Sequence, residues 1–162
     1  MPSYGPNFFT GGSASQDSYS DISQDGAKAF DGNTATYWLS AASAFPHWVK
    51  YDLGAGVTKK IAKLTMDVHD FIGATTMTVK DFTIQGSNDD STYTTLQTLQ
   101  ATSGDGIQSF EFTPSATAYR YYEINITTNY RADSYAAINE LYAYESTSVP
   151  ATNIGNMFFA ML

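Results

Sequence analysis

The stretch FDGNTATYW, residues 30–38, combines a tight turn, several oxygen-bearing side chains and a terminal tryptophan. Asp31 and Gly32 form a turn dipeptide, because glycine adopts positive φ freely and an Asp side chain bonds backbone amides just downstream. In such a bend the Asp31 carboxylate, the Asn33 side chain and the Thr36 hydroxyl can turn inward together with backbone carbonyls. These groups make the oxygen-only ligand set that Ca²⁺ prefers. By itself the stretch leaves two interpretations open, a cation site and an ordinary turn.

Four further landmarks follow this stretch in order. They are HWVKYDLG at 47–54, FTIQGSNDDSTYTTL at 82–96, AYRYYEINI at 118–126 and AAINELYAYE at 136–145. The ordered set resembles the discoidin family, also called coagulation factor 5/8 type C or galactose-binding-like domains. The resemblance extends over residues 13–145 and implies an antiparallel β-sandwich.

The residue pattern favours the same fold class without the resemblance. Turn signals recur about every 8–15 residues, apolar and polar side chains alternate with a period of two, and no helical period exceeds one turn. We therefore predict an all-β protein, an antiparallel jelly-roll sandwich of about eight strands. GAKAF, residues 26–30, should form a single helical turn, VKDFTIQG, residues 79–86, a strand with a bulge, and Trp38 an apolar anchor of the core.

We expect three segments along the chain. Residues 1–12 form an N-terminal arm whose Phe8 and Phe9 look exposed, and residues 13–145 form the sandwich. Residues 146–162 form a tail that ends in the apolar side chains Met157, Phe158, Phe159, Met161 and Leu162. Because an exposed apolar segment promotes association, we expect the tail to dock on another virion protein or on a second copy, with packing on its own domain as the alternative.

Composition excludes several classes of protein. With 162 residues, the chain is long enough for one domain whose core needs no cross-links. Its formal net charge of -8 opposes binding to phosphate backbones, so we expect no nucleic-acid partner. Cysteine is absent, which excludes disulfides and thiolate metal sites and, because many eukaryotic extracellular relatives carry a disulfide, indicates a prokaryotic or viral source. Neither a secretory signal nor an apolar run of about 18 residues is visible, so no membrane insertion is expected.

Catalytic motifs are missing from the sequence. There is no G-x-S-x-G, H-E-x-x-H, Walker loop or G-x-G-x-x-G pattern. Only His47 and His69 ordinarily titrate near neutral pH, and each has a structural role available at a loop or strand end. Asp89 and Asp90 are adjacent in a polar turn, where neighbouring carboxylates point apart. The sequence therefore predicts a protein that is not an enzyme.

The resemblance also implies a structural calcium site. In discoidin-like and related carbohydrate-binding modules a calcium ion lies under the first loop and is held by oxygens of that loop and of the last strand. The matching positions here are the backbone oxygen of Lys28, the side chains of Asp31, Asn33 and Thr36, the carbonyl of Asn139 and the carboxylate of Glu140. Such a site would stabilise the fold by linking distant segments.

The expected ligand face lies on the loops beside that site. In sugar-binding members of the family a His follows the Trp of the first motif and an Arg ends the next strand. Here Leu39 stands at the His position and His69 or Asp70 at the Arg position, which weakens the expectation of galactose specificity. The candidates for stacking on a sugar or bonding its hydroxyls are His47, His69, Asp70, Phe71, Asn129, Tyr130, Arg131 and Tyr135.

These expectations describe a non-catalytic module that binds a cell-surface glycan or serves in adhesion. Similar domains occur in bacteriophage tails, fibres and capsid decorations, so we expect display on a virion surface, with an extracellular location as the alternative. The acidic balance argues against lipid binding. The rival function is a purely structural or assembly subunit of a virion that has no sugar ligand.

Overall fold

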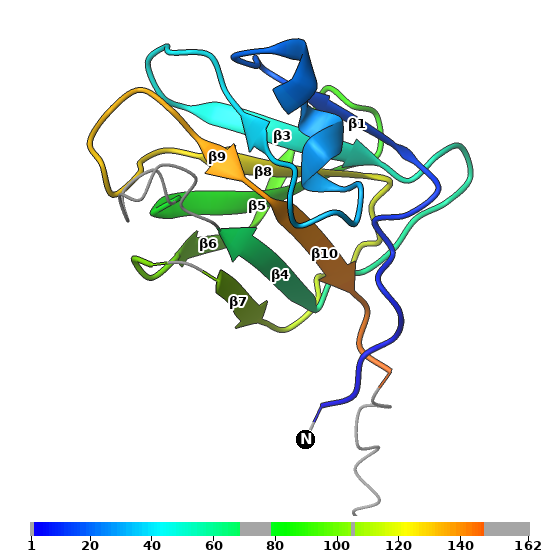
Figure 1. The fold of residues 1–162 in the computed structure, drawn as a ribbon. Coiled ribbons are helices and arrows are strands. Elements are labelled where there is room, and N and C mark those ends of the chain that lie inside the picture. The colour runs from blue at the N-terminus through cyan, green and yellow to red at the C-terminus, as the bar shows by residue number, and fades with distance from the viewer. Residues whose placement is uncertain (1, 69–78, 105, 148–162) are drawn as a thin grey trace, which may run out of the picture.

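The computed structural model describes residues 2–68, 79–104 and 106–147. In these ranges the chain forms a β-sandwich with two short 3-10 helices beside β1 (Figure 1). The strands are β1 (Ser13–Gln16), β2 (Trp38–Leu39), β3 (His47–Asp52), β4 (Lys63–Val68), β5 (Asp81–Ser87), β6 (Thr94–Gln100), β7 (Gly106–Glu111), β8 (Tyr121–Ile126), β9 (Ala137–Ile138) and β10 (Glu140–Tyr144). The helices are η1 (Ile22–Gln24) and η2 (Gly26–Ala29), and η2 is the helical turn expected at that place.

All strand pairs are antiparallel, and they form three sheets. The orders are β1-β3-β8-β5-β6, β10-β4-β7 and β2-β9. The predicted all-β sandwich is confirmed. The described ranges hold ten strands rather than about eight, because Trp38 begins a two-residue strand and the last predicted strand is divided into β9 and β10. A bulge occurs where predicted, but the extra residue is on β6: Ile84 pairs with Gln97 and Gln85 with Thr95.

Alternating burial along the strands produces the core. In β3, Val49 and Tyr51 are buried while Lys50 between them faces the other side, as the two-residue period of a strand requires. Trp38 is fully buried, and its indole N–H donates a 2.9 Å hydrogen bond to the Ser18 carbonyl. Burying a ring of this size contributes on the order of 4 kcal/mol before ordering costs. Trp38 is therefore an anchor of the core, as predicted.

The N-terminal arm is part of this core, so the expectation that Phe8 and Phe9 are exposed is wrong. Their exposed fractions are 9% and 2%. The ring of Phe9 lies 5.1 Å from that of Tyr51. The arm runs along the end of β10, where the Phe8 amide donates to the Ala143 carbonyl at 2.9 Å. This backbone pairing directs the two rings inward.

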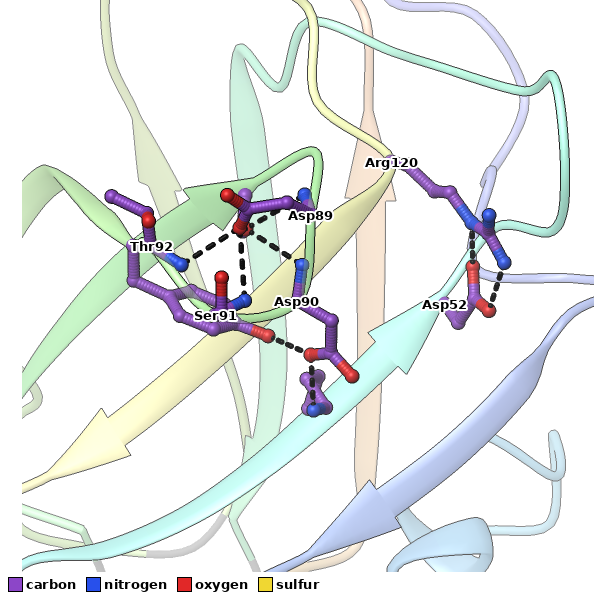
Figure 2. Close-up of polar contacts among 9 residues, drawn as sticks. Asp52, Asp89, Asp90, Ser91, Thr92 and Arg120 are labelled. Atoms are coloured by element: carbon purple, nitrogen blue, oxygen red, sulfur yellow. Dashed lines mark hydrogen bonds and ion pairs between the residues drawn. The ribbon is translucent and has the colours of Figure 1, made fainter.

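The turn between β5 and β6 folds over β3 (Figure 2). Asp89 Oδ1 accepts hydrogen bonds from the amides of Ser91 and Thr92 at 2.9 and 2.7 Å, and these bonds hold the pKa of Asp89 far below its usual value. Asp90 instead pairs with Lys50 on β3. The two carboxylates therefore have different partners, and neither forms a paired acid–base site with the other.

A second polar contact fastens the end of β3 to the start of β8. Arg120 Nε and Nη2 donate to the two carboxylate oxygens of Asp52 at 2.6 and 2.7 Å (Figure 2). This two-point geometry fixes the relative position of the two segments better than a single bond would.

Candidate functional site

The first loop forms the predicted turn. Gly32 has a φ of 74°, which a residue without Cβ adopts at no steric cost. The Asp31 carboxylate lies inside the turn, where Oδ1 accepts from the Asn33 amide at 2.9 Å. The Thr36 hydroxyl lies 3.0 and 2.9 Å from the two carboxylate oxygens. The loop therefore brings the side chains of Asp31 and Thr36 into contact, while Asn33 Oδ1 accepts from the Ala35 amide at 3.1 Å.

The end of the chain supplies the other half of this site. Glu140, the first residue of β10, is fully buried, and its Oε1 accepts a 2.9 Å hydrogen bond from the Asn33 amide. Its Oε2 has no hydrogen-bond partner among the described residues. Asn139 is 2% exposed, donates from Nδ2 to the Thr34 carbonyl at 3.2 Å, and has an Oδ1 that likewise lacks a described partner. Two buried oxygens are thus left without donors beside the first loop.

Two carboxyl groups share this small volume, and their ionisation is coupled. Burial is the main cause that raises the pKa of Glu140 to about 7. A hydrogen bond with Asp31 and the negative charge of Asp31 act in the same direction. Burial also acts to raise the pKa of Asp31, but hydrogen bonds from Thr36 and Asn33 outweigh it, so the pKa of Asp31 is lowered. One carboxylate is therefore held ionised, while its neighbour keeps a proton near neutral pH unless a positive charge compensates it.

These residues fit a calcium ion. Two carboxyl groups, a hydroxyl and the orphaned side-chain carbonyl oxygen of Asn139 are the donors that a hard cation takes, and no softer ligand is among them. The described residues contain no cluster of three or more His, Cys, Asp or Glu side chains suited to a metal, so most ligands would be neutral oxygens. Lys28 is close by: its Nζ lies 3.7 Å from Asp31 Oδ2.

A cavity of about 370 Å³ opens where β8 ends and β5 begins. It is lined by Phe45, Lys80, Thr128, Asn129, Ala132 and Asp133. Asn129 is 6% exposed and donates from Nδ2 to Asp133 and to the Tyr135 carbonyl. Asn129 Oδ1 has no hydrogen-bond partner among the described residues. Asn129 is therefore held in place by two hydrogen bonds from its amide nitrogen to its own loop.

Three other sequence candidates lie on the same loop and have internal partners. The Tyr130 hydroxyl donates to the Ala101 carbonyl at 2.7 Å, and Lys80 Nζ lies 5.7 Å from the Tyr130 ring centroid. Arg131 is exposed and forms a 3.1 Å ion pair with Asp133. Tyr135 is half-buried and contributes its carbonyl to Asn129. The contacts with Ala101 and Lys80 fix the Tyr130 side chain, so it is not a free aromatic at a loop tip.

His47 differs from the expectation of a sugar contact, because its side chain is fully buried. Its Nδ1 lies 2.7 Å from Asp17 Oδ2, and its Nε2 lies 3.2 and 3.1 Å from the carbonyls of Ser43 and Ser134. These carbonyls belong to the two loops that supply Phe45 and Asp133 to the cavity. His47 thus joins the loops from inside and does not face the cavity.

The remaining ligand candidates, His69, Asp70 and Phe71, lie outside the described residues. Sequence reasoning missed Phe45, Lys80 and Asp133 as lining residues. Asp133 lies in the same polar loop as Asn129, so its place in that loop could have predicted it as a lining residue. Phe45 and Lys80 come from two other connections, and only the fold brings them to Asn129.

The sequence profile of the F5/8 type C domain matches residues 12–141. The chain belongs to the F5/8 type C domain family. The predicted discoidin membership is thereby confirmed, and this domain spans β1 to the start of β10. No curated protein sequence matches the chain significantly.

Solved structures of carbohydrate-binding modules share the fold. A chitosan-binding module 2 from a chitosanase/glucanase of Paenibacillus sp. IK-5, in complex with chitotriose, is 28% identical with a TM-score of 0.68, over 86% of this chain and 100% of that one. CpGH89CBM32-5 from Clostridium perfringens, in complex with GalNAc-beta-1,3-galactose, is 16% identical with a TM-score of 0.74, over 87% and 100%. The family 32 module of NanJ from C. perfringens, in complex with galactose, is 18% identical with a TM-score of 0.71, over 90% and 100%.

These solved structures are binding modules, and the similarity extends over the whole of each module. A truncated AlyQ with a family 32 module and an alginate lyase domain is matched over only 35% of its chain, and the AlyQ module by itself over 97%. The likeness therefore lies in the binding module. Among the described residues, no helix has the length and apolar character needed to cross a membrane.

Proposed function

We propose that this F5/8 type C domain is a non-catalytic module that binds a glycan in the cavity formed by Phe45, Asn129 and their neighbours. The observation that carries the proposal is the cavity itself, whose lining combines the aromatic side chain of Phe45 with the polar side chains of Lys80 and Asp133. Such polar groups can bond the hydroxyls of a sugar. Phe45 adds an aromatic face on which a sugar ring can stack.

Chitotriose and galactose are the first ligands to test. Both are bound by similar modules, and the chitotriose-binding module is the more similar of the two in sequence. The net charge of -8 supports an amino-sugar oligomer, since an acidic protein attracts cations over a distance. In this proposal Phe45 stacks on a sugar ring, and Lys80 donates to a sugar hydroxyl.

Calcium forms the second part of the proposal. We infer that one Ca²⁺ is held by Asp31, Asn33, Thr36 and Glu140, with backbone oxygen from Lys28 and a carbonyl of Asn139. The orphaned oxygens of Asn139 and Glu140 support this assignment. The ion would supply positive charge that lets both carboxyl groups stay ionised, and it would stabilise the contact between the first loop and β10.

Display on a bacteriophage virion is the third part, and it is supported by sequence features alone. The chain lacks cysteine and carries an apolar segment at 157–162 that would bury its side chains against virion proteins if the domain itself left them uncovered. A purely structural subunit without a sugar ligand remains the competing function for such a chain.

Calorimetric titration with chitotriose and galactose, followed by a broad glycan array, tests the binding function. We expect wild-type protein to bind at least one of these sugars and Phe45→Ala to bind about tenfold or more weakly. Phe112→Ala is the matched control, because Phe112 is also half-buried against the core but does not line the cavity. Silence of the folded wild-type protein on every sugar would support the structural function instead.

A further inference from the structure

A groove of about 690 Å³ lies at the end of the sandwich where both described chain ends emerge (Figure 1). β8 separates it from the candidate sugar cavity: Lys59, beside the start of β8, lines the groove, and Thr128, after its end, lines the cavity. The two hollows therefore occupy opposite ends of the domain.

The groove wall is mostly apolar. Pro6 and Phe8 of the N-terminal arm face Pro114 of the connection after β7. Three charged residues line the groove: Lys59 and Glu145 form a 2.8 Å ion pair, and Lys60 is the third. The apolar side chains of the lining are suited to an uncharged, apolar segment.

The chain itself leads such a segment to the groove. Thr147, whose amide donates to the Ser3 carbonyl at 2.8 Å, is both a groove-lining residue and the last described one. The fifteen residues that follow, SVPATNIGNMFFAML, contain no Asp, Glu, Lys or Arg, and the last six are all apolar. The chain thus passes from the groove rim into a segment whose chemistry matches the groove.

We propose that residues 157–162 of the same chain occupy this groove, so that Met157, Phe158 and Phe159 pack against Phe8, Pro6 and Pro114. The nine intervening residues, 148–156, are numerous enough for the chain to turn back, because nine residues reach at most about 30 Å when fully extended. A tether of this length gives an effective concentration on the order of millimolar. The tail of a second copy competes for the groove only when it binds strongly enough to outweigh this effective concentration.

The absence of cysteine allows a direct test in the full-length chain. In the double variant Ser115→Cys/Phe158→Cys, one thiol is in the groove wall and the other is in the proposed occupant. In the control Ala44→Cys/Phe158→Cys, the first thiol sits in the exposed loop before β3, at the opposite end of the domain. Mild oxidation followed by non-reducing electrophoresis and peptide mass mapping reports which disulfides form.

We expect the groove pair to form an intramolecular disulfide at least tenfold faster than the control pair. Equal rates for the two pairs would overturn the proposal, and preferential dimer formation by the groove pair would assign the groove to the tail of a second copy. As an independent measurement, Phe158→Ser/Phe159→Ser should lower the melting temperature, whereas Thr152→Ser should not. An unchanged melting temperature in the first variant also contradicts docking. Neither readout involves a sugar, so the outcome is separate from that of glycan binding.

Discussion

The backbone amide of Asn33 donates a 2.9 Å hydrogen bond to Oε1 of Glu140, although 107 positions separate the two residues in the chain. The same amide also donates to Asp31 Oδ1 at 2.9 Å. One N–H group therefore holds the only two carboxyl groups of the candidate calcium site together. Because Asn33 lies in the first loop and Glu140 begins β10, this contact couples segments that are far apart in the chain.

Removing calcium should lower the melting temperature. A ligand at 100 times its dissociation constant stabilises a protein by about 2.7 kcal/mol, and a domain of this size gains about 2–4 °C per kcal/mol. We therefore expect excess chelator to lower the midpoint by about 5–10 °C in thermal unfolding at neutral pH. Asp31→Ala should remove the calcium response, because it deletes a ligand.

Asp21→Asn is the control for the chelation experiment. Asp21 caps η1 through the Ser23 amide and lies outside the calcium ligand set, so this variant should keep the full calcium response. Purified protein that contains no metal, and whose melting curve is the same with calcium and with chelator, would show that the first loop is only a turn.

The metal-free protein should lose stability as the pH rises towards neutrality. The pKa of Glu140 is raised to about 7 in the fold, from an ordinary value of 4.5. A raised pKa favours the protonated carboxyl in the folded state, so its contribution is complete below about pH 4.5 and is lost as the pH rises through 7. Glu140→Gln should abolish this slope in denaturant unfolding measured from pH 4.5 to 8 with chelator present.

Calcium should reverse the dependence of stability on pH, because the ion binds the ionised carboxylate of Glu140. The calcium-induced rise in melting temperature should therefore grow between pH 5 and 7.5. A rise that is equally large at pH 5 would contradict the assignment of Glu140 as a ligand.

His47 should affect sugar binding from a buried position. His47→Phe removes the ring nitrogen that lies 3.2 and 3.1 Å from the carbonyls of Ser43 and Ser134, and a lost hydrogen bond of this kind costs about 0.5–1.5 kcal/mol. His47→Gln keeps an N–H donor on a side chain of similar reach. We expect both variants to be less stable than wild type, and the Gln variant to retain more of the sugar affinity in titrations well below the melting temperature.

Asp17→Asn separates loop positioning from general destabilisation. It weakens the contact to Nδ1 of His47 but leaves the carbonyl partners of Nε2 in place. This variant should lose stability with little loss of affinity. If the affinity of all three variants simply follows their stability, His47 has no specific role in placing the loops.

The local part of the fold could be predicted from the sequence because it depends on neighbouring residues. The turn at Gly32 and the helical turn at 26–30 follow from local backbone chemistry. The anchoring role of Trp38 follows from its size. The depth of Phe8 could not be predicted in this way, because it depends on pairing with Ala143 at the far end of the chain.

The candidate sugar cavity shows the same limit. Asn129 was found from its polar loop, whereas Phe45 and Lys80 carry no local signal and reach the cavity only through strand order. His47 was selected as a polar group that could bond sugar hydroxyls. The atoms that its ring nitrogens contact lie in Asp17, Ser43 and Ser134, which are separated by 30, 4 and 87 positions from it, so the sequence does not reveal them.

The pairing of Tyr4 with Ser146 makes the domain directional. Any support joined to either end of the described chain, whether an affinity tag, a sensor surface or a larger particle, is attached on the side away from Phe45 and Asn129. A single copy immobilised through either end therefore presents its candidate sugar cavity outward. Many copies fixed to one surface would present their cavities in parallel, and weak individual contacts to a polymer would then combine into strong attachment.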